Sequence, residues 1–377
     1  TWEVIVQYQG DLAFLEGQGV RVTLLLFSYA ILLVPESLMD YVTGLPQITY
    51  LEKPKLLYFA DAFVRSISCI TPVQEGVMGL SGNGVLLACI DSGVDYAHPD
   101  FCAPDGTSRI AILWDQTIPG NPPMGYALGS VYTRQQINEA LASSTPEERF
   151  ALVPSRDVTG HGTAVLGIAA GNGRSSAYAA MRGVAPEATL VVVKLGNPDP
   201  ADLPRTSQLL QAVDFCVRYA LLVERPLVIN LSFGNNYGSH SGDSLLETYL
   251  NAVSNLGQNV ICIGAGNEGD TGRHYAGNLK SDRKSSGQTQ TVRATSDPAA
   301  TSAVSATADR AVSVEFQVGA YESSFSLQIW KVYGDEISIE LISPGGIRSG
   351  TLSPVLGTAR LTLGPTELLL FYGMPSP

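Results

Sequence analysis

The sequence predicts an α/β protein built on a parallel sheet, with a small α+β unit before it and a β-rich segment after it. Four short and almost wholly apolar runs predict strands that are buried on both faces: Val85–Asp91, Thr189–Leu195, Leu227–Ser232 and Asn259–Gly264. Helical patterns alternate with them along the chain, at Gly162–Gly171, Leu209–Val223 and Ser244–Gly257. This alternation is typical of a sheet flanked by helices.

Residues 1–60 predict a unit of their own with the order β-α-β-β-α-β. The expected strands are Glu3–Tyr8, Val20–Phe27, Ala30–Val34 and Gln47–Leu51. The expected helices are Leu12–Gly17, which Asp11 can cap, and Pro35–Thr43. This is the split-βαβ order of ferredoxin-like folds. Because free-standing binding modules also use that fold, the order alone leaves the role of the unit open.

From about Val292 the sequence pattern changes: Thr- and Ser-rich runs alternate polar and apolar residues, and turn residues separate the runs. The expected strands are Val312–Phe316, Ser326–Trp330, Ile337–Leu341 and Arg360–Leu363. Short alternating strands between turns are typical of an antiparallel β-sandwich. We therefore expect three domains, at residues 1–60, 61–291 and 292–377.

The composition excludes several classes of function. Hydrophobic residues make up 45% and charged residues 15%, so the chain is not a disordered one. The formal charge of −12 comes without any Lys/Arg cluster, which excludes a nucleic-acid partner. We expect no membrane span, because the longest apolar run, Leu24–Val34, is too short and is interrupted.

Cysteine and histidine spacing gives no sign of a disulfide framework, a metal site or a cofactor. The chain has five cysteines and no C-x-x-C pair. Cys89 and Cys262 lie in apolar strand-like runs, where free thiols are usually buried. The histidines His98, His240 and His274 show no metal-like spacing.

Three polar side chains fall where the functional groups of α/β proteins gather. Asp91 ends an apolar strand, and such groups collect at the carboxyl edge of a parallel sheet. His161 begins a predicted helix between two glycines, which allow a tight turn and a close approach. Asn267 follows Gly264–Gly266, where small residues leave room for a ligand and an amide can donate to an oxyanion. Taken singly, the three also fit a loop carboxylate, a helix cap and a turn residue.

Taken together and in this order, the motifs resemble those of the subtilases, the subtilisin-like serine peptidases. Ile90–Asp95 with His98–Asp100 resembles the aspartate motif, and Gly160–Thr163 resembles the histidine motif. Leu231–Gly234 and Gly264–Asn267 are similar to the substrate-binding strand and the oxyanion-hole segment. The resemblance covers residues 1 to about 290 and implies that the first 60 residues are a propeptide whose tail lies in the cleft.

The resemblance implies a role for each motif residue. Asp91 orients His161, and His161 takes the proton of a serine hydroxyl and returns it to the leaving amine. Asn267, with a backbone N–H, stabilises the tetrahedral oxyanion. The residues expected to pair with the substrate backbone or to border its pocket are Leu195, Gly196, Ser232, Phe233, Gly234, Gly264, Ala265 and Gly266.

Within the subtilases, the chain is most similar to the Csp germination proteases of spore-forming clostridia. Ser68–Gln74 and a jelly-roll-like β insertion after Asn267 carry this narrower resemblance. It implies limited proteolysis that activates a spore-cortex lytic proenzyme, and a spore-associated or secreted location. The expected start of the mature chain lies between Leu57 and Phe63.

The sequence departs from the family at the nucleophile. The serine motif Gly-Thr-Ser-x-x-x-Pro does not occur, and Gly357–Ala359 matches only its first two letters before a strand-like run. Two explanations stay open. The chain is the front part of a longer enzyme whose serine lies in a further C-terminal segment or a separate chain, or it is an inactive pseudoprotease that acts as a binding partner. Gly171–Tyr178 has no carboxylate, so the calcium loop of many subtilases is also expected to be missing.

Overall fold

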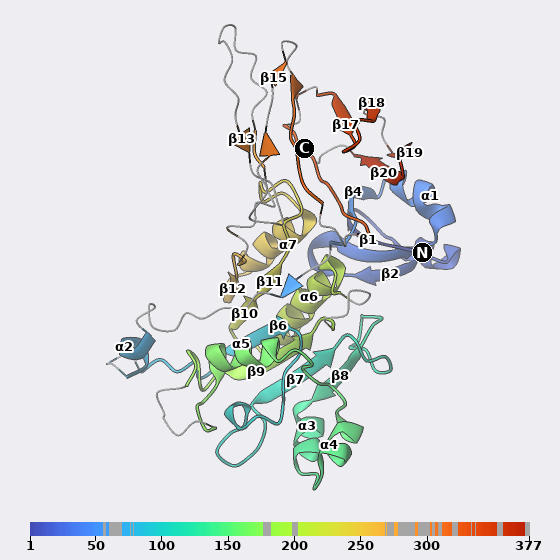
Figure 1. The fold of residues 1–377 in the computed structure, drawn as a ribbon. Coiled ribbons are helices and arrows are strands. Elements are labelled where there is room, and N and C mark those ends of the chain that lie inside the picture. Colours follow the sequence, from blue (N-terminus) through green and yellow to red (C-terminus); the bar gives the residue numbers. More distant parts are fainter. Residues whose placement is uncertain are drawn as a thin grey trace. The chain divides into compact units, whose positions relative to one another are not determined.

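The computed structural model describes residues 1–55, 58–59, 70–75, 77, 79–175, 182–197, 203–267, 269, 275–277, 291–292, 302–303, 306–307, 311–318, 323–332, 334–335, 337–352 and 357–373. It divides into two compact units, Thr1–Phe325 and Ser326–Pro377 (Figure 1). The domain boundary expected at 291/292 falls among residues that lie mostly outside the described ones, so it stays a prediction.

The N-terminal segment (residues 1–55) folds into an antiparallel sheet with the strand order β2-β3-β1-β4. Its strands are β1 (Trp2–Tyr8), β2 (Arg21–Leu24), β3 (Tyr29–Val34) and β4 (Ile48–Glu52). Its helical turns are η1 (Ala13–Gln18), η2 (Leu26–Ser28), η3 (Glu36–Leu38) and α1 (Met39–Thr43). The predicted β-α-β-β-α-β order is confirmed. The first helix is a 3-10 helix, because it is short, contains Gly17 and ends at the left-handed Gly19.

A six-stranded sheet forms the core of the first unit. Its strands, in spatial order, are β12 (Asn259–Ile263), β10 (Leu227–Leu231), β6 (Leu86–Asp91), β9 (Thr189–Lys194), β7 (Ile110–Asp115) and β8 (Ser130–Thr133). All neighbours are parallel except β7 and β8. The helices are α2 (Ile70–Glu75), η4 (Pro99–Phe101), α3 (Arg134–Leu141), α4 (Pro146–Leu152), α5 (His161–Ala170), α6 (Thr206–Leu222) and α7 (Leu245–Ser254).

The alternation of side chains along β6 divides the core into two layers. Leu86, Ala88 and Ile90 pack with residues of α6 and α7 on one face. Leu87 and Cys89 pack with residues of α5 and α3 on the other face. Both layers are fully buried at these positions, as expected for a parallel strand covered on both faces.

The sequence prediction missed β7, β8, α3 and α4. A usable signal was present, since α3 and α4 both begin with a capping box. Thr133 pairs with Gln136, and Thr145 pairs with Glu148, in the Thr-x-x-Gln and Thr-x-x-Glu spacings that mark helix starts. No described helix is long and apolar enough to span a membrane.

The prediction was wrong about the burial of β12. It lies at the edge of the sheet, and Val260 and Ile263 are 56% and 58% exposed. Cys262, expected to be buried, is exposed for the same reason, whereas Cys89 is buried. An apolar composition indicates that a strand is stable when side chains pack on both of its faces. The described residues pack on β12 only in part.

Residues after 290 form short antiparallel pairs. In the first unit these are β13 (Thr291–Val292) with β14 (Ser302–Ala303) and β15 (Ala306–Thr307) with β16 (Ala311–Val312). In the second unit they are β17 (Ile339–Ile342) with β18 (Arg348–Leu352) and β19 (Gly357–Leu363) with β20 (Thr366–Tyr372). Residues 313–318 and 324–332 form no ladder, so the strands expected at Val312–Phe316 and Ser326–Trp330 are wrong. The described residues from 311 to 373 contain no helix.

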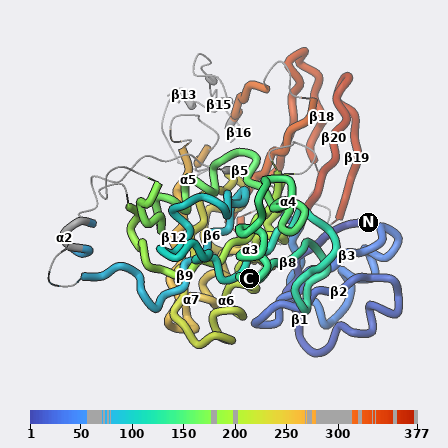
Figure 2. The backbone as a smooth tube through the Cα atoms, turned by 90° about the horizontal axis from the view of Figure 1, so that it is seen from below, coloured from blue at the N-terminus to red at the C-terminus, as the bar shows by residue number. Residues whose placement is uncertain are grey.

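The N-terminal segment packs on the helices of the core through a buried carboxylate, that of Asp214 in α6. Figure 2 shows β1 beside α6 and α7. Asp214 is fully buried; its Oδ1 accepts hydrogen bonds from the Leu26 N–H (3.0 Å) and the Tyr249 hydroxyl (2.8 Å). Its Oδ2 accepts from the Tyr126 hydroxyl (2.7 Å) and Arg218 Nε (2.6 Å). Burial raises the pKa of both tyrosines and the Asp214 charge raises it further, so both hydroxyls stay protonated as donors.

Two glutamates of the same segment lie at the first turns of these helices. Glu52 Oε2 accepts from the Leu245 N–H at the start of α7 (3.0 Å). Glu3 accepts from the Ser207 hydroxyl in the first turn of α6 and from Arg205 (3.0 Å). Negative charge is favourable at helix N-termini, so the acidic segment complements this face of the core.

Asp214→Asn is expected to lower the free energy of unfolding by about 1–3 kcal/mol, because the amide nitrogen cannot accept from the tyrosine hydroxyls and the Leu26 N–H that bond to the buried carboxylate. Urea titration followed by circular dichroism measures this change. Glu139→Gln is the control, since its carboxylate makes one exposed bond to Gln135 on α3 and should change stability by less than about 0.5 kcal/mol. A loss below about 1 kcal/mol for Asp214→Asn would contradict the prediction.

Candidate active site

The carboxyl ends of four parallel strands meet at one edge of the sheet. Asp91 ends β6 opposite Lys194 of β9, and Leu231 of β10 lies between Ile90 and Ile263. Each strand end is followed by a segment that the sequence analysis singled out. The predicted gathering of these segments at one edge is therefore observed.

Asp91 and His161 form a buried hydrogen-bonded pair. His161 Nδ1 lies 2.7 Å from Asp91 Oδ1, and the two residues are 9% and 1% exposed. The same oxygen accepts the Ser92 N–H at 2.7 Å. A carboxylate oxygen can only accept here, so the imidazole carries its proton on Nδ1 and turns Nε2 away from Asp91. The expected contact between the two side chains is confirmed.

Glycines allow the helix to approach the strand this closely. His161 is the first residue of α5, and Gly160 before it has φ 75°, in the left-handed region that favours glycine. At Gly162, an added Cβ would lie 2.1 Å from the Gly93 carbonyl oxygen and 3.1 Å from Asp91 Cβ. Any larger residue would push α5 away from β6 and separate His161 from Asp91.

Burial is the main influence on the charge of Asp91. It raises the pKa of this carboxyl above the ordinary 3.8, and the hydrogen bonds from His161 and Ser92 offset only part of the increase. Asp91 Oδ2 is buried and has no hydrogen-bond partner among the described residues. The site therefore holds a carboxylate whose negative charge is incompletely compensated, as catalytic groups often are.

The segments expected to bind the substrate and the oxyanion, 231–234 and 264–267, lie beside each other at the ends of β10 and β12. The Gly264 N–H donates to the Leu231 carbonyl (2.9 Å), which continues the pairing of the strands into the loop. Gly266 has φ 89°, so the chain turns there immediately before the exposed Asn267. The Ser232 hydroxyl accepts from Asn230 (2.8 Å) at the end of β10.

Short strands pair residues 58–59 with residues 233–234. β5 (Tyr58–Phe59) runs antiparallel to β11 (Phe233–Gly234), with Phe59 opposite Phe233 and Gly234 opposite Tyr58. Residues 58–59, which follow the N-terminal segment, thus add a strand to the segment expected to bind substrate. Residues 56, 57 and 60, on either side of this pair, lie outside the described residues.

Leu195 fits its expected role poorly. Its N–H donates to the Asp91 carbonyl (2.9 Å), and its carbonyl accepts from Gln208 Nε2 (3.2 Å). Both backbone groups are therefore engaged inside the molecule, which argues against pairing with a substrate. Gly196 follows it as a buried residue.

Sequence reasoning missed the polar side chains that surround the pair. Asp157, Thr159 and Thr163 contact Ser92 or the start of α5, and the buried Lys194 donates to the Arg156 carbonyl (2.7 Å). The signal was the run of Asp and Thr directly before the histidine motif, which is typical of a capped helix start.

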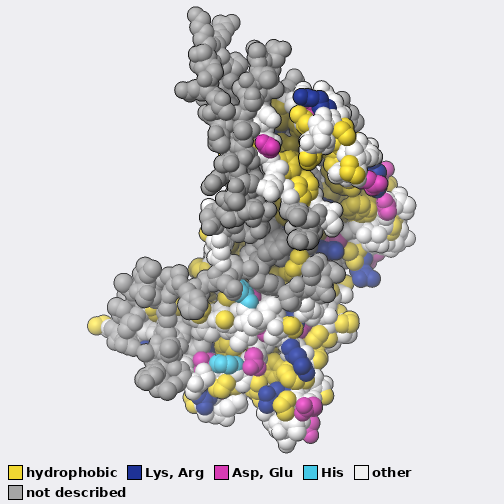
Figure 3. Space-filling model, viewed as in Figure 1, with side chains coloured by type: hydrophobic (Ala, Val, Ile, Leu, Met, Phe, Trp, Pro, Cys, Tyr) yellow, Lys and Arg dark blue, Asp and Glu magenta, His cyan; other side chains and the backbone are white. Residues whose placement is uncertain are grey.

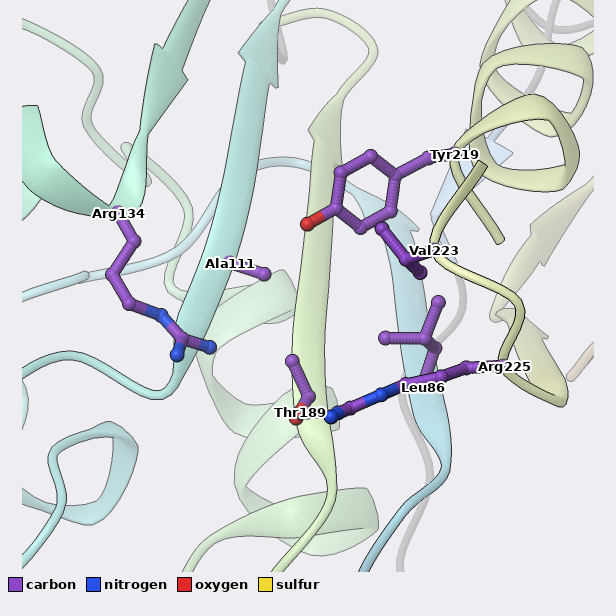
Figure 4. Close-up of a pocket in the computed structure, with 7 residues that line it drawn as sticks. All are labelled: Leu86, Ala111, Arg134, Thr189, Tyr219, Val223 and Arg225. Carbon is purple, nitrogen blue, oxygen red and sulfur yellow. Dashed lines mark hydrogen bonds between the residues drawn. The ribbon is translucent and has the colours of Figure 1, made fainter. Parts of the chain in front are cut away.

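The described residues contain no group of His, Cys, Asp and Glu side chains that could hold a metal ion. A pocket lies at the opposite, amino edge of the sheet (Figure 4), lined by Leu86, Ala111, Arg134, Thr189, Tyr219, Val223 and Arg225. On the face shown in Figure 3, acidic and basic side chains are interspersed.

Comparison with known proteins identifies the class. The subtilase family pattern matches residues 82–365, and the chain belongs to this family. Its first part, residues 1–55, matches the Csp protease B prodomain. The fold is similar to that of the CspB protease of Clostridium perfringens, with 28% identity and a TM-score of 0.60 over 81% of this chain and 56% of that chain.

Curated relatives agree at the level of the family. Subtilisin E of Bacillus subtilis is 26% identical over 60% of this chain and 46% of its own length. The major intracellular serine protease of the same species is 30% identical over 54% of this chain and 49% of its own length. The chain thus spans about half the length of the relatives it matches.

Asp91→Asn is expected to raise the free energy of unfolding at pH 7. Folding raises the pKa of Asp91, so ionised Asp91 reduces stability; this penalty is absent below the ordinary pKa of 3.8 and complete above the raised pKa. Asparagine keeps the acceptor for His161 without the charge. Urea titrations at several pH values should show a difference that vanishes as the pH falls towards 3.8.

Asp11→Asn provides the control for this titration, because Asp11 is exposed and bonds only the Ala13 N–H (2.9 Å). It should leave the stability nearly unchanged at each pH. A parent protein that is more stable than Asp91→Asn at pH 7 would contradict the prediction.

Proposed function

We propose that this chain is the front part of a subtilisin-type serine endopeptidase together with its inhibitory prodomain. The observation that carries the proposal is the buried 2.7 Å hydrogen bond between His161 Nδ1 and Asp91 Oδ1. In this arrangement Asp91 holds the imidazole in the tautomer whose Nε2 can accept a proton. The match of residues 82–365 to the subtilase family supports the same chemistry.

The proposed reaction is acyl transfer to a serine hydroxyl. His161 Nε2 accepts the hydroxyl proton as the oxygen attacks the scissile carbonyl, and the proton then passes to the leaving amine. Asp91 stabilises the imidazolium that forms between these steps. Asn267 donates to the oxyanion of the tetrahedral intermediate. Ser232, Phe233 and Gly234 pair with the substrate backbone on one side of the cleft, Gly196 lies on the other, and Gly264–Gly266 border the specificity pocket.

The prodomain is proposed to inhibit by occupying the substrate position. The pairing of Tyr58–Phe59 with Phe233–Gly234 supports this, because it uses the backbone groups that a substrate would need. We propose that the chain is cut close to this segment during maturation, between residues 57 and 63, and that the remaining enzyme acts on protein substrates.

The nucleophile is proposed to come from polypeptide beyond these 377 residues, either further along the same chain or as a separate chain. The sequence contains no Gly-Thr-Ser-x-x-x-Pro motif, and the Ser232 hydroxyl is already bonded to Asn230 at the end of β10. The exposure of Val260 and Ile263 on the edge strand β12 supports a missing apolar cover at this side of the core.

Similarity to the CspB protease of Clostridium perfringens suggests the biological setting. We propose limited proteolysis of a spore-cortex lytic proenzyme during germination, in a spore-associated or secreted location. The alternative is a pseudoprotease that retains the cleft as a binding surface, and the missing serine motif is the observation that favours it.

Labelling with a serine-directed fluorophosphonate tests the proposal. The 377-residue chain should not be labelled, because no serine is held beside His161 by the family motif. The full gene product, after removal of the prodomain, should be labelled and should cleave peptides. His161→Gln in that product is the control, and it should abolish both signals. Labelling of the short chain would show a nucleophile elsewhere, and an unlabelled full product would favour the pseudoprotease.

Asn267→Ala in the full product should lower kcat strongly with little change in KM. The loss of one oxyanion donor in subtilisin, on the order of 10²–10³-fold in kcat, sets the scale. Steady-state kinetics on a chromogenic peptide measure the change. The matched control is Asn255→Ala, which removes an exposed amide at the end of α7 and should leave kcat unchanged. An equal effect of the two substitutions would remove Asn267 from the proposed machinery.

A further inference from the structure

One carboxylate, that of Asp157, forms hydrogen bonds both to the residue after β6, which carries Asp91, and to the start of α5, which carries His161. We propose that Asp157 is a positioning residue, which fixes the start of α5 against the end of β6 and so keeps His161 beside Asp91. This inference rests on the proposed function, but its main test does not require catalysis.

The N–H groups in the first turn of α5 donate to acceptors outside the helix. Its capping position is Gly160, which has no side chain to accept them. The His161 N–H donates to Thr159 Oγ1 (3.2 Å), and the Gly162 N–H donates to Ser92 Oγ (2.9 Å). The Thr163 N–H donates to Asp157 Oδ2 (2.8 Å). All three acceptors belong to the network around Asp157.

Asp157 joins the strand side to the helix side. Its Oδ1 accepts from the Ser92 hydroxyl (2.8 Å), next to Asp91, and from the Gly160 N–H (3.0 Å). Its Oδ2 accepts from both the N–H and the hydroxyl of Thr163 (2.8 and 2.7 Å), two residues after His161. A shift of either element would break bonds to the same carboxylate.

The loop that carries Asp157 is itself held in place. The buried Ser155 hydroxyl donates to Asp115 Oδ2 (2.6 Å) on β7, and the buried Lys194 Nζ donates to the Arg156 carbonyl (2.7 Å). An added Cβ at Gly93 would lie 3.4 Å from Asp157 Cα, so the loop also packs directly on the turn after Asp91. Because its loop is bonded to the sheet, Asp157 holds the start of α5 in a fixed position relative to the sheet.

Electrostatics supports this geometry. Burial alone would raise the pKa of Asp157, but hydrogen bonds from Thr163, Ser92 and Gly160 hold it below its ordinary value. Asp157 thus stays ionised at neutral pH, and an anion at the start of a helix is favourable.

The test is NMR of the 377-residue chain, in which the His161 Nδ1 proton reports its bond to Asp91. The chain has four histidines, so His161→Gln assigns this resonance. In Asp157→Asn, an amide NH2 group would face the N–H and hydroxyl of Thr163, which are donors themselves, and these hydrogen bonds would be lost. The His161 Nδ1 proton resonance should then shift upfield, or this proton should exchange with solvent at least about tenfold faster. Thr163→Val should act in the same direction, and Thr163→Ser should restore the parent signal.

Asp105→Asn is the matched control. Asp105 also accepts from the N–H and hydroxyl of a threonine, Thr107 (3.0 and 2.7 Å), but on an exposed turn outside the network around Asp157. It should leave the His161 resonance unchanged. An unchanged resonance in folded Asp157→Asn would overturn the inference. If that variant does not fold, Ser92→Ala and Thr163→Val decide by the same criterion.

Kinetics of the full gene product separate this inference from the proposed function. Asp157→Asn should lower kcat by about 10–100-fold with KM nearly unchanged, since displacement of a catalytic group by about 1 Å has effects of this size. A full product that is inactive even as wild type, together with a perturbed His161 resonance, would refute the protease and keep the positioning role. If the full product is active and Asp157→Asn changes neither kcat nor the His161 resonance, the protease stands and the positioning role of Asp157 is refuted.

Discussion

The close backbone approach of α5 to the end of β6 is the constraint on which the site depends. At Gly162 the helix lies so near the Gly93 carbonyl that no Cβ can fit, and this proximity brings His161 within hydrogen-bond distance of Asp91. A helix that begins this close to a strand cannot use its own capping residue. The first-turn N–H groups therefore take acceptors from Ser92, Asp157 and Thr159.

This approach has a cost, which appears in the electrostatics of Asp91. The carboxylate is buried, one of its oxygens has no partner among the described residues, and its pKa is raised by desolvation. For Asp157, which bonds to Ser92 beside Asp91, the net effect on the pKa is the opposite: hydrogen bonds lower the pKa by more than burial raises it. Two neighbouring carboxylates thus differ in a way that suits different tasks: an incompletely compensated charge beside the imidazole, and a saturated one that holds the backbone.

The sequence predicted those parts of the fold that leave a strong local pattern. Apolar runs located β6, β9, β10 and β12 within one or two residues, and the motifs located Asp91 and His161. The sequence did not reveal which strand would lie at the edge, since burial is set by tertiary neighbours and not by composition. It also missed Asp157 and Lys194, because a polar residue in a loop acquires its role only from partners far along the chain. The sequence also could not show that both backbone groups of Leu195 bond inside the molecule.

The two sides of the proposed site are supported unequally by the described residues. The side that holds Asp91 and His161 lies between buried strands and a helix, and its polar groups bond to residues of the same core. The side that holds Gly264–Asn267 follows β12, an edge strand with large exposed apolar side chains. A segment that covered β12 would act first on the loop after it, where the amide lies, and only weakly on the pair. The proposed proton-transfer side of the site is thus formed within this chain, whereas the geometry of the proposed oxyanion side depends on what packs against the edge of the sheet.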